Sequence, residues 1–160
     1  MGKGRAVVYF HGGEWSGCRS PTREELEYSE KTLQQRFPRT VRQLFQQCAL
    51  GRPAKSLFVS DKYDAEVAVG YVLDVGRPSG DVTTVVEAWE HILRNAEHKG
   101  DAAEPSLLPF AIDYGHANYF CLDSVGRVVY RVLDEEAGRG RKVVADSIEE
   151  FIDGLEELSF

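Results

Sequence analysis

Hydrophobic residues near the start of the chain recur at intervals of three and four positions, which is the period of an amphipathic helix. Thr22 and Glu25 have the spacing of a capping box, so a helix is predicted to begin just after Thr22. This helix ends at Phe37 and Pro38, because proline disfavours helical geometry in the residue before it. Its predicted inward face consists of Leu26, Ser29 and Leu33, with Tyr28 beside it.

The same period predicts two further helices. The second begins at Pro38, a residue suited to the first helical turn, and closes at 51–53. Its apolar positions are Val41, Leu44, Phe45 and Cys48. The third begins where Thr84 and Glu87 repeat the capping-box spacing, and it ends near 98–100. Its broad apolar face consists of Val85, Ala88, Trp89, Ile92, Leu93 and Ala96.

Short apolar runs bounded by turn residues predict strands on both sides of the third helix. The predicted strands lie at 56–60 and 66–73 before it and at 107–112, 118–123, 127–133 and 142–145 after it. Residues 123–126 and 138–140 have turn composition, so the last four strands are expected to form an antiparallel meander. A fourth helix follows Asp146, where Ser147 and Glu150 give a third capping-box spacing. Its predicted inward residues are Phe151, Ile152, Leu155 and Leu158.

The order of these elements predicts an α+β fold. Its central antiparallel sheet is expected to be flanked by the N-terminal helices, the middle helix and the C-terminal helix. The chain has 160 residues and no repeat or linker, so a single domain over 1–160 is expected. Residues 1–20 form an N-terminal extension of unassigned role. Within it, an apolar run at 5–10 is followed by turn-forming residues at 11–17.

Charge is unevenly distributed along the chain. The net charge is −7, yet residues 1–56 hold ten Lys and Arg against five Asp and Glu, whereas 57–160 hold nine against 21. An acidic surface of this kind repels nucleic acid and anionic membranes and attracts basic proteins, although it also serves solubility alone. No apolar run is long enough for a membrane span or for the apolar core of a signal peptide, so a cytoplasmic location is expected.

The chain contains three cysteines, Cys18, Cys48 and Cys121. Their number is odd and no two have the Cys-x-x-Cys spacing, so neither a disulfide framework nor a zinc ribbon is expected. Cys48 and Cys121 lie in apolar stretches, which indicates that both are small core residues.

Two motifs in the second half of the chain stand in a characteristic order and spacing. The first is LPFAIDYGHANYFCLD at 108–123, followed by a strand and the acidic run 134–136. The second is ADSIEEFI at 145–152. Together with the first helices, they resemble the SUKH superfamily, which includes a yeast cell-wall assembly regulator and many bacterial toxin-immunity proteins. The resemblance covers roughly 21–158, with one departure at 116–117, where the family usually has glycine before asparagine.

The resemblance implies an α+β domain that acts by binding, because many bacterial members neutralise toxins delivered between cells, often nucleases. It implies no catalytic residue and no cofactor. Asp113, Gly115 and Asn118 suit a turn, and 146–147 suit a helix cap, so the motif residues are interpreted as structural. Residues 1–20 have no counterpart in the family pattern.

Acidic residues in predicted turns, with tyrosines nearby, are the candidate partner-binding residues. Nuclease toxins bind polyanions through Lys and Arg, and an inhibitor that presents carboxylates can occupy such a site and exclude the substrate. Tyrosines supply the apolar anchors that interfaces favour. The candidates are Asp61, Tyr63, Asp64, Glu66, Tyr71, Asp113, Tyr114, His116, Asp134, Glu135 and Glu136. The expected partner is a cognate protein toxin with a basic surface, rather than a nucleic acid or a membrane. Solvated loops explain the same acids, and the oligomeric state is left open.

Two other functions are consistent with the sequence. One is an intracellular scaffold or regulator without a toxin partner. The other is a small hydrolase that uses Cys18 with His11 or His116, or a histidine–carboxylate pair. His91 and His98 lie seven positions apart on the third helix, but no nearby cysteine completes a tetrahedral metal set, so surface histidines are the simpler interpretation.

Overall fold

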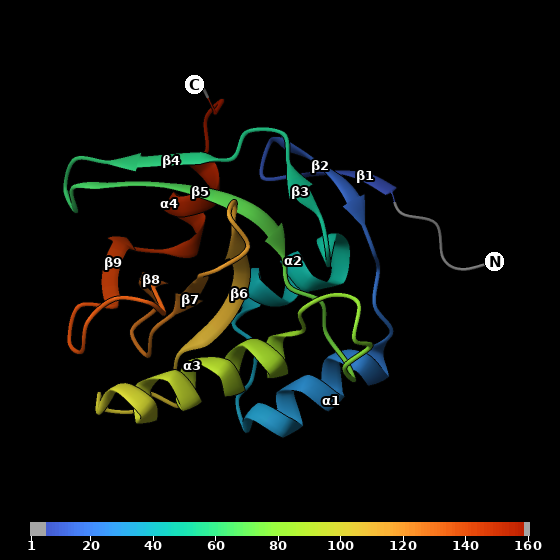
Figure 1. The fold of residues 1–160 in the computed structure, drawn as a ribbon. Helices are drawn as coiled ribbons and strands as arrows, with labels where there is room; N and C mark the ends of the chain where they lie inside the picture. The colour runs from blue at the N-terminus through green and yellow to red at the C-terminus, as the bar shows by residue number, and fades with distance from the viewer. Residues whose placement is uncertain (1–5, 159–160) are drawn as a thin grey trace.

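The α+β fold expected from the sequence is confirmed by a computed structural model, which describes residues 6–158 (Figure 1). Its helices are α1 (Arg23–Leu33), α2 (Arg39–Cys48), α3 (Val85–Lys99) and α4 (Ile148–Asp153). Its strands are β1 (Ala6–Phe10), β2 (Gly13–Cys18), β3 (Arg52–Pro53), β4 (Leu57–Ser60), β5 (Ala65–Val72), β6 (Leu108–Asp113), β7 (Tyr119–Leu122), β8 (Val128–Arg131) and β9 (Arg141–Ala145).

Strands β4 to β9 form one antiparallel sheet in which every strand pairs with its neighbour along the chain. The predicted meander is therefore confirmed, with α3 inserted between β5 and β6. The predicted hairpin turn is also present, because Gly126 N donates to Asp123 O at 3.1 Å. Short connections join the consecutive strands from β6 to β9, which is why a local pattern could predict this part of the sheet.

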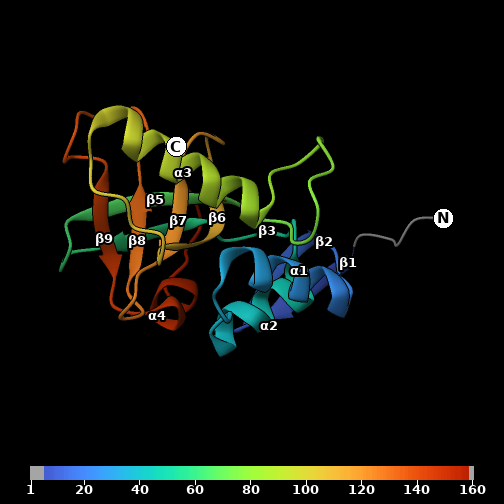
Figure 2. The ribbon, with the colours of Figure 1, turned by 90° about the horizontal axis from the view of Figure 1, so that it is seen from below.

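A helix covers each face of the central sheet (Figure 2). Tyr119 and Phe120 are consecutive in β7, so their side chains point to opposite faces. On one face, His91 Nδ1 of α3 lies 3.2 Å from the Tyr119 hydroxyl. On the other face, the Phe151 ring of α4 lies 5.1 Å from the Phe120 ring and 4.8 Å from that of Phe58. Phe151 thus occupies the centre of the core between α4 and the sheet.

The N-terminal segment forms a second, three-stranded sheet that the sequence did not predict. β1 and β2 form a hairpin, and β2 pairs with β3 through Trp15 opposite Pro53. Trp15 and Cys18 are buried, so this extension contributes to the core. The turn composition of 11–17 concealed β2, because Pro53, which pairs with Trp15, lies 38 positions further along the chain.

An ion-pair network connects the end of β2 to α1 and to the segment that follows β5. Arg19 follows β2, and its guanidinium donates to Glu25 of α1 at 3.0 Å and to Asp74 after β5 at 2.6 Å. The Arg19 and Asp74 side chains are largely buried. The hydrogen bonds that Glu25 receives from Arg19 and Thr22 outweigh its burial and hold the pKa of its carboxyl below the usual range.

The predicted helix starts are largely confirmed. Thr22 with Glu25 and Thr84 with Glu87 form complete capping boxes. Ser147 accepts a hydrogen bond from Glu150 N at 3.0 Å, although among the described contacts the Glu150 side chain makes no return bond.

The extent predicted for the last helix was wrong. α4 ends at Asp153, and Glu156 instead pairs with the backbone of Leu57, so Leu155 and Leu158 lie outside the helix. The chain turns at Gly154, where an added Cβ would lie 2.9 Å from the Phe58 ring. The β-type pairing with β4 therefore overrides the helical spacing of the leucines.

Replacing Phe151 with alanine should lower the free energy of unfolding by about 3 to 5 kcal/mol, because it leaves a cavity among packed aromatic rings. Urea unfolding followed by circular dichroism measures this change. The matched control is Val125→Ala in the exposed 123–126 turn, which should change stability by no more than about 0.5 kcal/mol. Equal effects of the two substitutions would contradict the packing described for α4.

Candidate partner-binding surface

The candidate residues fall into three groups on the folded chain. Tyr71, Asp113, Tyr114 and His116 lie on β5, at the end of β6 and in the β6–β7 loop. Asp134, Glu135 and Glu136 lie in the β8–β9 loop. Asp61, Tyr63, Asp64 and Glu66 lie in and beside the β4–β5 turn. The first two groups share one hydrogen-bond network, and the third is attached separately to β9 and the start of α4.

The carboxylate of Asp113 is the centre of that network. Asp113 is only 6% exposed, and its Oδ1 accepts hydrogen bonds from Ala117 N at 2.9 Å and Asn118 N at 3.1 Å. Its Oδ2 accepts from Asn118 Nδ2 at 3.1 Å and from the Tyr130 hydroxyl at 2.6 Å. Asp113 is therefore corrected from a candidate contact residue to a positioning residue, because its carboxylate is enclosed and saturated with donors.

These hydrogen bonds determine the ionisation of the buried pair. Burial alone would raise the pKa of Asp113, but the donors from Tyr130, Ala117 and Asn118 stabilise the carboxylate and hold its pKa below the usual range. Burial, together with the bond that it donates to Asp113, raises the pKa of Tyr130. Asp113 is thus an anion and Tyr130 a neutral donor near neutral pH.

Asn118 extends the network from the β6–β7 loop to the β8–β9 loop. Its Oδ1 accepts a hydrogen bond from Leu133 N at 3.0 Å, and Asn95 Nδ2 of α3 donates to Leu133 O at 2.8 Å. The Lys99 ammonium at the end of α3 donates to Glu135 O. The acidic residues 134–136 therefore stand on a loop whose backbone is held from both sides, while their side chains remain exposed.

The exposed part of the β6–β7 loop packs against Tyr71. The His116 ring meets the Tyr71 ring edge-on with centroids 5.2 Å apart, and the Arg52 guanidinium lies 5.4 Å from the same centroid. His116 has a φ of 58°, a left-handed conformation that glycine adopts more readily. This left-handed residue lies where the chain departs from the family pattern. Tyr114 is 51% exposed beside this group.

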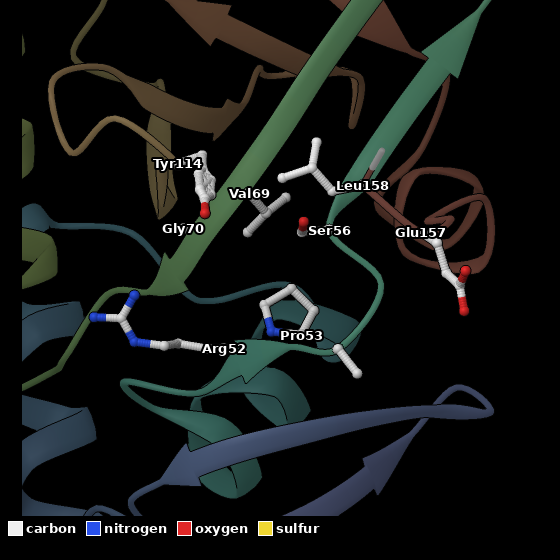
Figure 3. Close-up of a pocket in the computed structure, with 9 residues that line it drawn as sticks. Arg52, Pro53, Ser56, Val69, Gly70, Tyr114, Glu157 and Leu158 are labelled. Atoms are coloured by element: carbon white, nitrogen blue, oxygen red, sulfur yellow. The ribbon is translucent and has the colours of Figure 1, made fainter. Parts of the chain in front are cut away.

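Tyr114 and Arg52 border a cleft of about 480 Å³ between β5 and the segment that joins β3 to β4 (Figure 3). Its lining includes Arg52, Pro53, Ser56, Val69, Tyr114 and Leu158. No pattern in the sequence points to Arg52 or Ser56, because neither belongs to a motif. Only the fold, which brings β3 beside β5, could identify them.

The β4–β5 turn is anchored at its base and exposed at its tip. The Tyr63 hydroxyl and the Lys62 ammonium both donate to Asp146, which precedes α4, and Lys142 Nζ of β9 donates to Asp64 O. The carboxylates of Asp61 and Asp64 face solvent. This turn and the β8–β9 loop both lie on the side of the molecule formed by β9, at the left in Figures 1 and 2.

The structure does not assemble the thiol–histidine pair of the hydrolase hypothesis. The Cys18 thiol is buried and donates to Trp15 O at 3.6 Å. His11 Nδ1 lies 3.1 Å from Asp153 Oδ1, while His116 packs on Tyr71. Within residues 6–158, no three His, Cys, Asp or Glu side chains converge as metal ligands.

The fold defines the chain as an α+β domain whose six-stranded antiparallel sheet carries a helix on each face. The family model described as the SMI1 / KNR4 family (SUKH-1) matches residues 20–154, so the chain belongs to that family. The resemblance noted in the sequence is thereby confirmed, and the family includes toxin-immunity proteins. Comparison with curated proteins gives no match. None of the described helices combines the length and apolar character that a bilayer crossing requires.

Replacing Asp113 with asparagine should destabilise the fold by about 2 to 3 kcal/mol near neutral pH, because a charged acceptor is lost beneath several donors. The folded-state pKa of Asp113 is lowered, so its contribution is present above the unfolded-state pKa of about 3.9 and is lost as the pH falls through the folded-state value. The difference between the parent and Asp113→Asn should therefore shrink below about pH 4. Urea unfolding of both proteins across this range measures it.

Tyr130→Phe is the matched control, because it removes one donor and keeps the carboxylate with its backbone partners. Tyr130→Phe should lower the free energy of unfolding by about 1 kcal/mol. A parent-to-asparagine difference that stays constant down to about pH 3 would contradict the assigned ionisation.

Proposed function

We propose that this chain is an immunity-type protein that neutralises a cognate, basic toxin by covering its active surface. The proposed contact surface consists of the β6–β7 loop with Tyr114 and His116, the β8–β9 loop with 134–136, and the exposed acids of the β4–β5 turn. Membership of a family that includes toxin-immunity proteins supports the class of function. The network around Asp113 is the observation that supports the surface.

This network supports a binding function because it orders the loops before any partner arrives. An exposed loop that must be ordered on binding loses conformational entropy, and this loss weakens the complex. Here the backbone of 117–118 is bonded to Asp113, and Leu133 is bonded to both Asn118 and Asn95. Buried or half-buried polar side chains thus hold the two loops, namely those of Asp113, Asn118, Tyr130 and Asn95.

The chemistry of the outer side chains indicates a basic partner. Asp134, Glu135 and Glu136 are exposed, and the nearby Lys99 and Arg139 neutralise them only in part. Carboxylates on one side of a molecule steer a basic surface into encounter, and an exposed tyrosine supplies apolar contact area. A nuclease toxin has such a basic surface because its substrate is a polyanion. Occupying that surface excludes the substrate and needs no chemistry from the inhibitor.

Reversing two charges in the β8–β9 loop, Asp134→Lys with Glu135→Lys, should lower the association rate constant for the toxin at least about tenfold. The toxin to be tested is the purified product of a candidate toxin gene encoded beside this one, and the rate is measured by surface plasmon resonance. Co-expression should show the corresponding loss of protection from growth arrest.

The matched control reverses Glu24 and Glu27, which are exposed on α1 and change the net charge by the same amount. This control should bind and protect as the parent does. Equal loss in both variants would show a general charge effect and contradict the assigned surface. A neighbouring toxin that neither binds nor is neutralised would overturn the proposed function and leave a regulatory interaction domain as the alternative.

Added salt should slow association of the parent with the toxin at least about tenfold between about 50 and 500 mM NaCl, because ions screen the long-range attraction. The association rate constant of the loop variant should fall much less over the same range. That of the α1 control should fall as much as that of the parent. Stopped-flow fluorescence at several salt concentrations measures all three slopes. Salt-independent association of the parent would contradict the electrostatic part of the proposal.

A further inference from the structure

Two of the three thiols lie together in the core, between the N-terminal hairpin and α2. Cys18 ends β2 and Cys48 ends α2, and both are free and buried. A Cβ added to Gly51 would lie 2.7 Å from Cys18 Sγ and 3.3 Å from Cys48 Cβ, so the two side chains border the same small space.

Backbone hydrogen bonds hold the segments that carry the two cysteines against each other. Arg19 N donates a hydrogen bond to Ala49 O at 2.7 Å. Arg19 follows Cys18 in the chain, and Ala49 follows Cys48. Gly51 N donates to Cys48 O at 2.9 Å and folds the chain back over the pair. Because Gly51 has no side chain, this residue places no side-chain atom in the space beside Cys18 Sγ and Cys48 Cβ.

We propose that Cys18 and Cys48 form a disulfide when the chain meets a disulfide oxidant such as oxidised glutathione. One cysteine thiolate attacks the oxidant, which forms a mixed disulfide and releases one glutathione. The second cysteine thiolate then attacks the protein sulfur and releases the other glutathione. The two protein thiols lose two protons and two electrons, and the oxidant gains them as two thiols.

Burial determines the rate of this reaction. It raises the pKa of both thiols, so the reactive thiolate is scarce in the closed structure. Oxidation therefore requires opening of the β1–β2 hairpin, and mild denaturant that favours opening should accelerate it. Cys121 is enclosed in β7 between Pro109 and Val129 and serves as an internal control.

The bond would connect the N-terminal extension to the region that the family model matches. Cys18 lies before the family-matched region 20–154, and Cys48 lies within it. β2 also pairs with β3 through Ser16 opposite Arg52, and Arg52 borders the cleft beside Tyr114. A Cys18–Cys48 disulfide would thus hold the extension, and through it one wall of the cleft, against the helices. This inference concerns the chain alone and does not depend on the proposed toxin partner.

The test incubates the full chain with oxidised glutathione in urea below the unfolding transition, then denatures it and alkylates the remaining thiols. Intact mass should show one alkylated cysteine in place of three, and peptide mapping should join Cys18 to Cys48. The thermal midpoint should rise by about 5 to 10 °C, because the cross-link restricts the unfolded chain, and a reductant should reverse the rise.

Single alanine variants separate the outcomes. Cys18→Ala and Cys48→Ala should show no internal disulfide and no rise in midpoint, whereas Cys121→Ala should behave as the parent. Each variant is first checked for the parent's circular dichroism spectrum. Three alkylated cysteines after oxidation of the parent, or a bond that includes Cys121, would overturn the proposal.

Discussion

The buried carboxylate of Asp113 is the interaction on which the candidate surface depends. It stands where β6 ends, and its two oxygens accept four hydrogen bonds from Ala117, Asn118 and Tyr130. An unpaired buried anion would be very costly, so the donors and the carboxylate require one another. The β6–β7 loop consequently has one preferred conformation, and Asn118 transmits the same restraint to Leu133 and the acidic loop beyond it.

The aromatic core provides the rigid base for these loops. Phe151 holds α4 against the sheet through Phe58 and Phe120, and α3 covers the opposite face and bonds to Leu133 through Asn95. The two helices therefore have different roles. α4 supplies apolar packing, while α3 supplies both packing and the polar contacts that hold the β8–β9 loop. A binding surface formed by loops needs such a rigid base, because the base determines the positions of the loops.

Much of the fold could be predicted because its elements are locally encoded. Thr22 with Glu25 and Thr84 with Glu87 marked two helix starts, and the turn at 123–126 marked a hairpin of the meander. The site was less predictable. The sequence predicted Asp113 both as a turn residue and, because it is acidic and next to Tyr114, as a candidate contact residue. Its carboxylate accepts a hydrogen bond from Tyr130, which lies 17 positions further along the chain.

The sequence by itself determined the α+β class, the order of the strands in the meander, the helix starts and the family. All of these depend on residues within a few positions of one another or on a linear motif. Only the tertiary structure decided the pairing of β2 with β3, the end of α4 at Asp153, the cleft beside Arg52 and the meeting of Cys18 with Cys48. Each of these is a contact between segments far apart in the chain. Such contacts are selected by the packing of the whole molecule, and no local periodicity records them.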